Sequence, residues 1–321
     1  MFLTAIPITA RVAAPLLALL CTLTIANRAL AKSLNGFELD QGLLPVAEIF
    51  QGGPPKDGIP AIDEPLFLAA EQMQVLEPDD MVLGITDGVQ SKAYPIGILN
   101  WHEIVNDELG GVPVVVTFCP LCGSGMVFER TINGQALDFG VSGLLYNSDV
   151  LLYDRQTDSL WSQIEQQAVT GFWQGQQLQP IAVQHTSWQR WQKNHPQTLV
   201  LSFDTGFRRR YNYDPYGGYE DTAATFFPVK FRAQGFHPKQ RVLGLEHNGI
   251  SRAWPLVELA KAGQPITDNI AGLPVFVHYD AASQTAWVED GQGQTITSVT
   301  LFWFAWAAFH EDTSVYHYQD Q

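Results

Sequence analysis

The stretch that decides the fold is "EPDDMVLGITDGVQSKAYPIGIL" (77–99), because it returns later as "HPKQRVLGLEHNGISRAWPLVEL" (237–259). In the first of these, two runs that alternate apolar and polar residues flank the turn residues Asp87 and Gly88. This pattern is typical of a β-hairpin. The sequence therefore predicts two copies of one unit, each starting with paired strands.

Further matches extend the repeat. "GGVPVVVTF" (110–118) matches "AGLPVFVHY" (271–279), and its β-branched residues predict a buried strand. "WQRWQKNHPQT" (188–198) matches "WFAWAAFHEDT" (303–313), with Trp, Trp and His at i, i+3 and i+7. That spacing places the three rings on one face of a short helix, where core packing is favoured over a cofactor site.

The first copy is longer than the second because it carries an insertion in about residues 131–185. We predict a β-rich α+β protein built from two related repeats packed together, the first with this long insertion. The expected parts are a signal peptide (1–31), an N-terminal arm (32–64), a first repeat (65–202), a linker rich in tyrosine and arginine (203–225), and a second repeat without cysteines (226–321).

The N-terminus has the pattern of an export signal. A single positive charge at Arg11 precedes the apolar run "VAAPLLALLCTLTIA", and Ala29-Leu30-Ala31 has the small-x-small form of a cleavage site. The apolar run is short for a membrane span of about 20 residues. We therefore expect a periplasmic or secreted protein with no stable membrane insertion; a retained signal anchor is the alternative.

The charge of the chain limits its partners. The formal net charge is −15, and loss of Arg11 and Arg28 with the leader would make it more negative. Such a surface repels nucleic acid, so we expect none as a partner. An aromatic-rich, 46% hydrophobic composition argues for a packed core rather than disorder.

The cysteine motif "TFCPLCGSG" (117–125) holds Cys119 and Cys122, two of the three cysteines in the chain. Such a pair is a redox couple, part of a metal site, or a structural clip. The clip is disfavoured because a bridge across so short a loop stabilises little. Glycines after the second cysteine oppose a helix, so we expect the cysteines in a hairpin-like loop. The second copy has "YDAASQT" there, which assigns the chemistry to the first copy.

His102 and Glu103 are the candidate helpers of the thiols. His102 is unique to the first copy and precedes the strand that delivers Cys119. It would promote the thiolate or complete a metal site, while Glu103 would orient the imidazole ring or act as a base. An exposed histidine at a helix end is the alternative.

The insertion supplies the candidate substrate-binding residues. Its polar and aromatic segment "VLLYDRQTDSLWSQ" sets an Asp-Arg pair among apolar residues. This pair would lower a cysteine pKa or bind a substrate carboxylate, unless it is an ordinary surface ion pair. The proposed substrate-binding residues are Ser142, Asp154, Arg155, Trp161 and Gln163.

Together, "GGPPKDGIPAIDEP", "AYPIGILNWHEIVND", "TFCPLCGSG", "FGVSGLLYNSDVLLYDRQTDSLWSQ" and "FWFAWAAFHEDT" resemble the bacterial and archaeal domain of unknown function numbered 3179. The resemblance covers nearly all of the chain after the leader. Some members of that family carry selenocysteine in the cysteine motif, which implies redox chemistry at Cys119 or Cys122. The resemblance assigns no role to the remaining residues.

Three functions stay open from the sequence. The first is an exported thiol oxidoreductase that needs no cofactor, in which one cysteine attacks and the other resolves, with a redox protein or a small molecule as partner. The second is an electron-transfer or metal-binding protein that holds copper or zinc with Cys119, Cys122 and His102. The third is a non-catalytic binding module that uses the linker.

Overall fold

The computed structural model describes residues 33–232 and 234–318. The expected signal peptide and the first residue of the arm lie outside the described residues. Among the helices of the described part, none has the length and the apolar character needed to cross a membrane.

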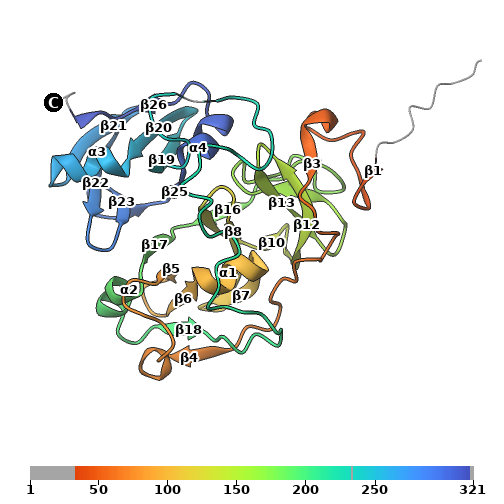
Figure 1. Ribbon diagram of the computed structural model, residues 1–321, viewed down its shortest axis with the longest axis horizontal. Helices are drawn as coiled ribbons and strands as arrows, with labels where there is room; N and C mark the ends of the chain where they lie inside the picture. Colours follow the sequence, from red (N-terminus) through yellow and green to blue (C-terminus); the bar gives the residue numbers. More distant parts are fainter. Residues whose placement is uncertain (1–32, 233, 319–321) are drawn as a thin grey trace, which may run out of the picture. The chain divides into compact units, whose positions relative to one another are not determined.

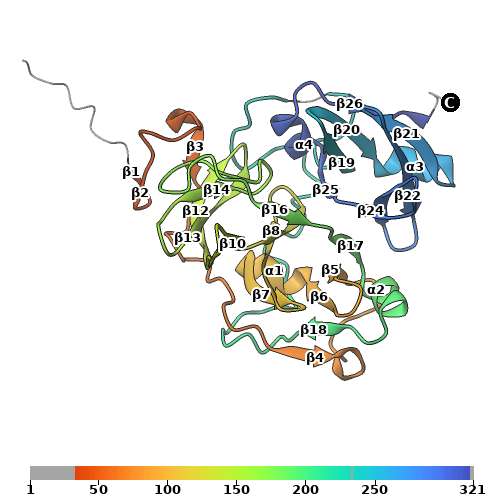
Figure 2. The same ribbon diagram turned by 180° about the vertical axis from the view of Figure 1, so that it is seen from behind.

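Strands dominate the described residues, which contain only four α-helices, so the predicted β-rich α+β class is confirmed. Five sheets of four or five strands form a propeller-like ring (Figures 1 and 2). The smaller elements are two two-stranded sheets, β1 (Ser33–Leu34) with β2 (Phe37–Glu38) and β10 (Thr131–Ile132) with β11 (Gln135–Ala136), and the 3-10 helices η1 (Val46–Glu48) and η2 (Ala70–Gln72).

The first copy forms two sheets that share a buried apolar cluster, to which Leu83 and Val116 belong. Helix α1 (Ile96–His102) follows strand β6 (Ser91–Pro95), and helix α2 (Trp188–Asn194) follows strand β17 (Gln184–Ser187). In spatial order, one sheet is β17 (Gln184–Ser187), β5 (Met81–Thr86), β6 (Ser91–Pro95), β18 (Leu199–Leu201) and β4 (Phe67–Ala69), and the other is β16 (Gln179–Ile181), β9 (Ser124–Glu129), β8 (Val112–Cys119) and β7 (Ile104–Leu109).

Apart from β4, which has no counterpart there, the strands of the second copy follow the same order. In both copies the strand after the second helix joins the sheet in parallel, β18 beside β6 and β26 beside β20, whereas the other pairings are antiparallel. Its elements are β25 (Val299–Phe302), β19 (Arg241–His247), β20 (Ile250–Pro255) and β26 (Ser314–Val315) in one sheet, β21 (Ile266–Ile270), β22 (Leu273–Asp280), β23 (Thr285–Asp290) and β24 (Thr295–Ile296) in the other, and helices α3 (Leu256–Ala262) and α4 (Trp303–Phe309).

The insertion builds most of the fifth sheet. The arm adds the edge strand β3, whose Phe50 pairs with Leu145 of β12. The arm therefore covers an edge that would otherwise expose unpaired backbone groups. In order, this sheet is β15 (Gln167–Ala168), β14 (Leu160–Ser162), β13 (Asp149–Asp154), β12 (Phe139–Tyr146) and β3 (Ile49–Gln51).

The repeated tryptophan and histidine stripe is a packing motif, as predicted. Trp191 stacks on His195 with ring centroids 3.9 Å apart, and its indole N–H donates to the Thr198 hydroxyl at 2.9 Å. Gly84 lies directly under the indole, where a Cβ atom would collide with the ring. The second copy repeats these contacts with Trp306, His310, Thr313 and Gly244.

A buried ion pair ties the hairpin of the first copy to its second sheet. The Lys92 ammonium lies 2.8 Å from the Asp107 carboxylate, which also accepts a hydrogen bond from the Tyr94 hydroxyl at 2.6 Å. Both charged side chains are only 8% exposed. The second copy has the same arrangement, less buried, in Arg252, Asp268 and Trp254.

Replacement of Asp107 should be costly. Asp107→Ala leaves the Lys92 ammonium buried without a counter-charge, so we expect the free energy of unfolding to fall by about 3–5 kcal/mol in urea titrations. Asp268→Ala is the matched control and should cost less, because its Arg252 side chain is 19% exposed and reaches solvent. A loss for Asp268→Ala as large as that for Asp107→Ala would contradict this account.

Candidate thiol and carboxylate centre

The two cysteines lie at the tip of the β8–β9 hairpin, as the sequence predicts. Cys119 ends β8 and pairs with Ser124 at the start of β9. The Cys122 backbone N–H donates to the Cys119 carbonyl at 3.2 Å and closes the turn. Gly123 adopts a φ of 61° against the ring of Phe302, so a side chain there would meet both backbone strain and that ring. Residues 119–124 are called the cysteine loop below.

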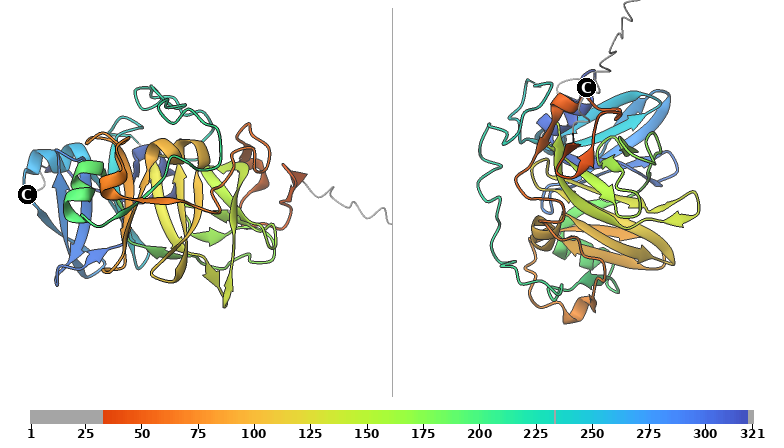
Figure 3. Two further views of the ribbon diagram at one scale, coloured as in Figure 1. Left: turned by 90° about the horizontal axis from the view of Figure 1, so that it is seen from below. Right: turned by 90° about the vertical axis from the view of Figure 1, so that its right-hand side faces the viewer.

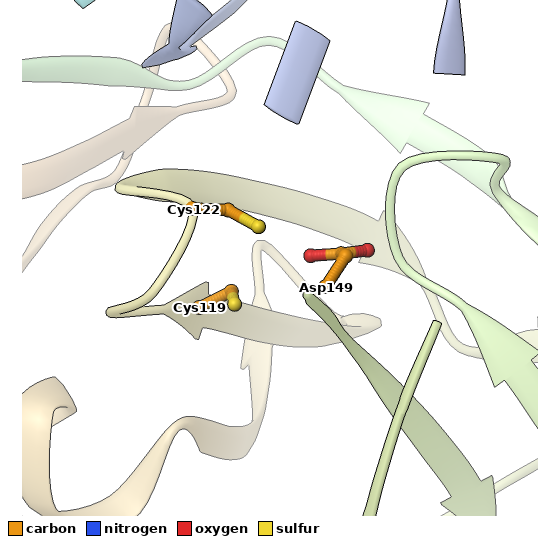
Figure 4. Close-up of side chains that lie close together, drawn as sticks. All are labelled: Cys119, Cys122 and Asp149. Atoms are coloured by element: carbon orange, nitrogen blue, oxygen red, sulfur yellow. The ribbon is translucent and has the colours of Figure 1, made fainter. Parts of the chain in front are cut away.

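A tight turn in the insertion brings Asp149 to the thiols (Figure 4). Asn147 and Ser148 both have positive φ, and Asp149 follows as the first residue of β13. The Ser148 carbonyl accepts hydrogen bonds from both thiols, with sulfur to oxygen distances of 3.7 Å for Cys119 and 3.4 Å for Cys122. The two sulfurs and a carboxylate oxygen of Asp149 all lie within 4.8 Å of one another. These three side chains are called the centre.

Burial disfavours the charged forms of the three side chains of the centre. All three side chains are at most 1% exposed. Burial raises the pKa of Asp149 to about 7, and it also raises the pKa of both thiols, that of Cys122 most. Asp149 Oδ2 accepts from the Ile164 backbone N–H at 3.2 Å, but no donor of standard geometry among the described residues reaches Oδ1. The two thiols are near enough to interact with this carboxyl group, which lowers its pKa against the effect of burial. A buried acceptor with no other donor is suited to an ion or a water.

Glu103 and two linker tyrosines surround the centre. Burial, and then repulsion by Asp149, raises the pKa of Glu103 to about 8. Tyr216 is close enough to Glu103 and Cys119 for their charges to raise its pKa further, after burial itself. Tyr219 is similarly close to both cysteines, and its buried hydroxyl has no hydrogen-bond partner of standard geometry among the described residues.

The second copy braces the cysteine loop. The Phe302 backbone N–H, at the end of β25, donates to the Cys122 carbonyl at 2.8 Å. A second contact joins the two copies elsewhere. Strand β17 of the first copy packs on β23 of the second, and the Thr285 hydroxyl donates to the Thr186 hydroxyl at 2.6 Å. The centre therefore needs the first copy, the insertion and the second copy.

The equivalent loop of the second copy is polar. Asp280 ends β22 and pairs with Thr285, so Asp280 and Ser283 occupy the positions of Cys119 and Cys122. The Asp280 carboxylate accepts from the Ser283 hydroxyl at 2.9 Å and pairs with Arg190 at 2.5 Å. The Asp280 carboxylate of this loop is therefore paired within the protein, whereas Asp149 Oδ1 beside the cysteine loop has no donor of standard geometry.

His102 does not join the centre. Its Nδ1 lies 2.7 Å from the Pro60 carbonyl, which only accepts, so Nδ1 carries the proton. Nε2 then accepts from the Tyr211 hydroxyl, also at 2.7 Å. Burial lowers the His102 pKa, which favours this neutral ring. With both nitrogens engaged, the imidazole holds the arm and the linker together.

Of the residues predicted in the insertion, Gln163 contacts the cysteine loop. Its Oε1 accepts from the Ser124 hydroxyl at 2.6 Å, and its Nε2 donates to Thr117 at 2.8 Å. The other four stabilise the insertion sheet or its contact with the arm: Ser142 bonds to the Leu151 carbonyl, Asp154 accepts from the Trp161 indole at 3.0 Å, and Arg155 pairs with Asp63 at 2.5 Å rather than with its neighbour Asp154.

Fold and centre together define a β-rich protein with a buried pair of thiols beside a carboxyl group. A family model described as "Protein of unknown function (DUF3179)" matches residues 56–313, so the chain belongs to that family. No curated protein and no solved structure matches the chain.

The thiols should be slow to react in the folded protein. Each unit by which burial raises a thiol pKa reduces the reactive thiolate about tenfold, so iodoacetamide should alkylate the chelator-treated native protein at least about tenfold more slowly than the urea-unfolded protein. The native rate should also keep rising above about pH 8.5, where an ordinary thiol levels off. Equal native and unfolded rates would contradict the buried centre.

Proposed function

We propose that Cys119, Cys122 and Asp149 bind one metal ion, zinc by preference and copper as the alternative. The observation that carries this proposal is the buried Asp149 Oδ1, which has no donor of standard geometry and belongs to a carboxylate within 4.8 Å of two thiol sulfurs. Two thiolates and a carboxylate are ordinary zinc ligands, whereas Cu(I) prefers sulfur and imidazole without a carboxylate.

Electrostatics favours a cation at this place. Burial raises the pKa of all three side chains, and the Asp149 charge raises those of the two thiols further. A divalent cation between them would lower these pKa values and take up the negative charge as the ligands lose their protons. A reactive dithiol would instead need a nearby positive charge to stabilise its thiolate. The sequence offered His102 for this role, but both of its ring nitrogens are hydrogen-bonded, to Pro60 and to Tyr211.

Three protein ligands leave a fourth position for water or a substrate oxygen, as in catalytic rather than structural zinc sites. A metal there would act as a Lewis acid. Glu103 is buried beside the centre and would be placed to exchange a proton with a molecule in that position. Zinc would thus make the protein a metal-dependent enzyme with Glu103 as its acid or base.

Metal content tests the ligand set. We expect about one equivalent of zinc in the protein purified without chelators, and its loss in Cys119→Ser. Asp149→Asn should weaken zinc binding at least about tenfold, because it removes an anionic ligand. Ser283→Ala, at the position equivalent to Cys122 in the second copy, is the control and should bind normally. His102→Gln separates this ligand set from the one expected from the sequence and should also bind.

Absence of both metals, even after zinc and copper are supplied to the folded protein, would overturn the metal proposal. Loss of zinc in His102→Gln with an unchanged fold would replace Asp149 by His102 in the ligand set.

The second candidate is the thiol oxidoreductase expected from the sequence. The observation that favours it is the Asp149 pKa of about 7, which suits a carboxylate that accepts a thiol proton at neutral pH. The two thiols would give two electrons and two protons to a partner disulfide, leaving a Cys119–Cys122 disulfide and a partner dithiol. Their burial limits such a partner to one that opens the loop.

Asp149→Asn tests this second candidate. In the metal-free protein, loss of the proton carrier should slow reduction of the Cys119–Cys122 disulfide by dithiothreitol by roughly 100-fold, the usual contribution of such a group. Stopped-flow measurements against the Ser283→Ala control would check this. An unchanged rate would remove Asp149 from any redox role.

We also propose that the two copies are related repeats that arose by duplication, since the strand orders of their sheets agree. Export to the periplasm or beyond the cell, with loss of residues 1–31, remains part of the proposal and rests on the N-terminal sequence pattern.

A further inference from the structure

A second feature of the molecule, outside the centre, is a pocket of about 450 Å³ under the linker. The linker runs as an extended strap along the side of the protein that carries α1 (Figure 3). It is held there by the Trp101 indole, which donates to the Tyr213 carbonyl at 3.3 Å, and by Asn100, which donates to Asp214 at 3.1 Å. The pocket lining includes Asn100, Trp101, Arg208, Arg209, Arg210 and Tyr216.

The three arginines of this pocket have no counter-charge. None of them makes an ion pair with any residue of the described ranges, although the chain has 33 acidic residues against 18 basic ones. The nearby carboxylate of Asp214 accepts from Asn100 and from the Tyr216 backbone instead. The arginines that do pair with a carboxylate are Arg130, Arg155, Arg190, Arg241 and Arg252.

This contrast indicates that the pocket is reserved for an anion. The three side chains are exposed, and their contacts within the protein are with neutral groups: Arg209 donates to the Arg208 carbonyl at 3.2 Å, and the Arg210 guanidinium lies 4.8 Å from the centroid of the Tyr213 ring. Three lining arginines without a carboxylate partner form a local positive region that attracts an oxyanion. The half-buried rings of Trp101 and Tyr216 add an apolar lining beside them. Arginine for the anionic group and aromatic rings for a flat, apolar group are the usual division of roles in small-molecule sites.

We propose that this pocket binds a small aromatic oxyanion, an aryl phosphate or an aryl carboxylate. The guanidinium groups of Arg208, Arg209 and Arg210 bind the oxyanion, and Trp101 contacts the aromatic ring. Tyr216 lines the pocket and also lies close to Glu103 and Cys119, so the bound molecule sits one side chain away from the centre. The site stands independently of the metal, because none of its residues is a proposed metal ligand.

Calorimetric titration of the purified protein tests the site. Phenyl phosphate and benzoate are the probes, and phenol is the uncharged control. We expect the charged probes to bind and phenol to bind at least about tenfold more weakly. Replacement of all three arginines by glutamine (Arg208→Gln, Arg209→Gln, Arg210→Gln) should weaken the charged probes at least about tenfold, because charge-assisted hydrogen bonds are lost.

Arg232→Gln is the matched control, since Arg232 is exposed and also lacks an ion pair within the described residues, yet does not line the pocket. It should leave binding unchanged. Trp101→Ala should weaken phenyl phosphate more than inorganic phosphate, because it removes the ring contact as well as one bond that holds the linker. Titrations of zinc-loaded and of chelator-treated protein separate this proposal from the metal proposal. Binding of the probes to both forms supports the pocket, whether or not the centre holds a metal.

Three results would overturn the proposal. These are absence of binding by both charged probes, an equal affinity for phenol, and a loss in Arg232→Gln as large as in the triple variant. The last would mean that positive charge anywhere in this part of the protein, rather than the pocket, attracts the anion.

Discussion

The centre depends on one backbone contact, the hydrogen bond from the Phe302 N–H to the Cys122 carbonyl. The ring of the same residue lies against Gly123, so the end of β25 fixes both the direction and the depth of the cysteine loop. The insertion then places the Ser148 carbonyl and the Asp149 carboxyl over the two sulfurs. A chain with only the first copy and its insertion would keep the contacts of Ser148 and Gln163 with the loop but would lack the brace from Phe302.

Much of this architecture follows from the sequence. The β-rich class, the paired strands, the helix stripe of Trp191 and the position of the thiols in a hairpin follow from local patterns, which residue spacing reveals. Asp149 follows from none of them. In the sequence it ends a turn, and its approach to Cys119 arises because a separate sheet packs against the first copy.

His102 and Glu103 show how one backbone angle changes a role. Both were expected at the thiols because they directly precede a strand that leads toward Cys119. Glu103 has a φ of 57°, so the chain turns sharply after α1. His102 consequently faces the arm and the linker, where Pro60 and Tyr211 engage it, while Glu103 lies near the centre. A positive φ outside glycine leaves little trace in a sequence.

The wide separation of the contributing residues also determines when the centre can form. A ribosome releases the chain from its N-terminus, so Cys119 and Asp149 emerge long before Phe302. Until that last brace is made, the loop has no fixed partner on that side. The centre can therefore be completed only after Phe302 has been made, and a chain that stops before Phe302 would carry both thiols without this brace.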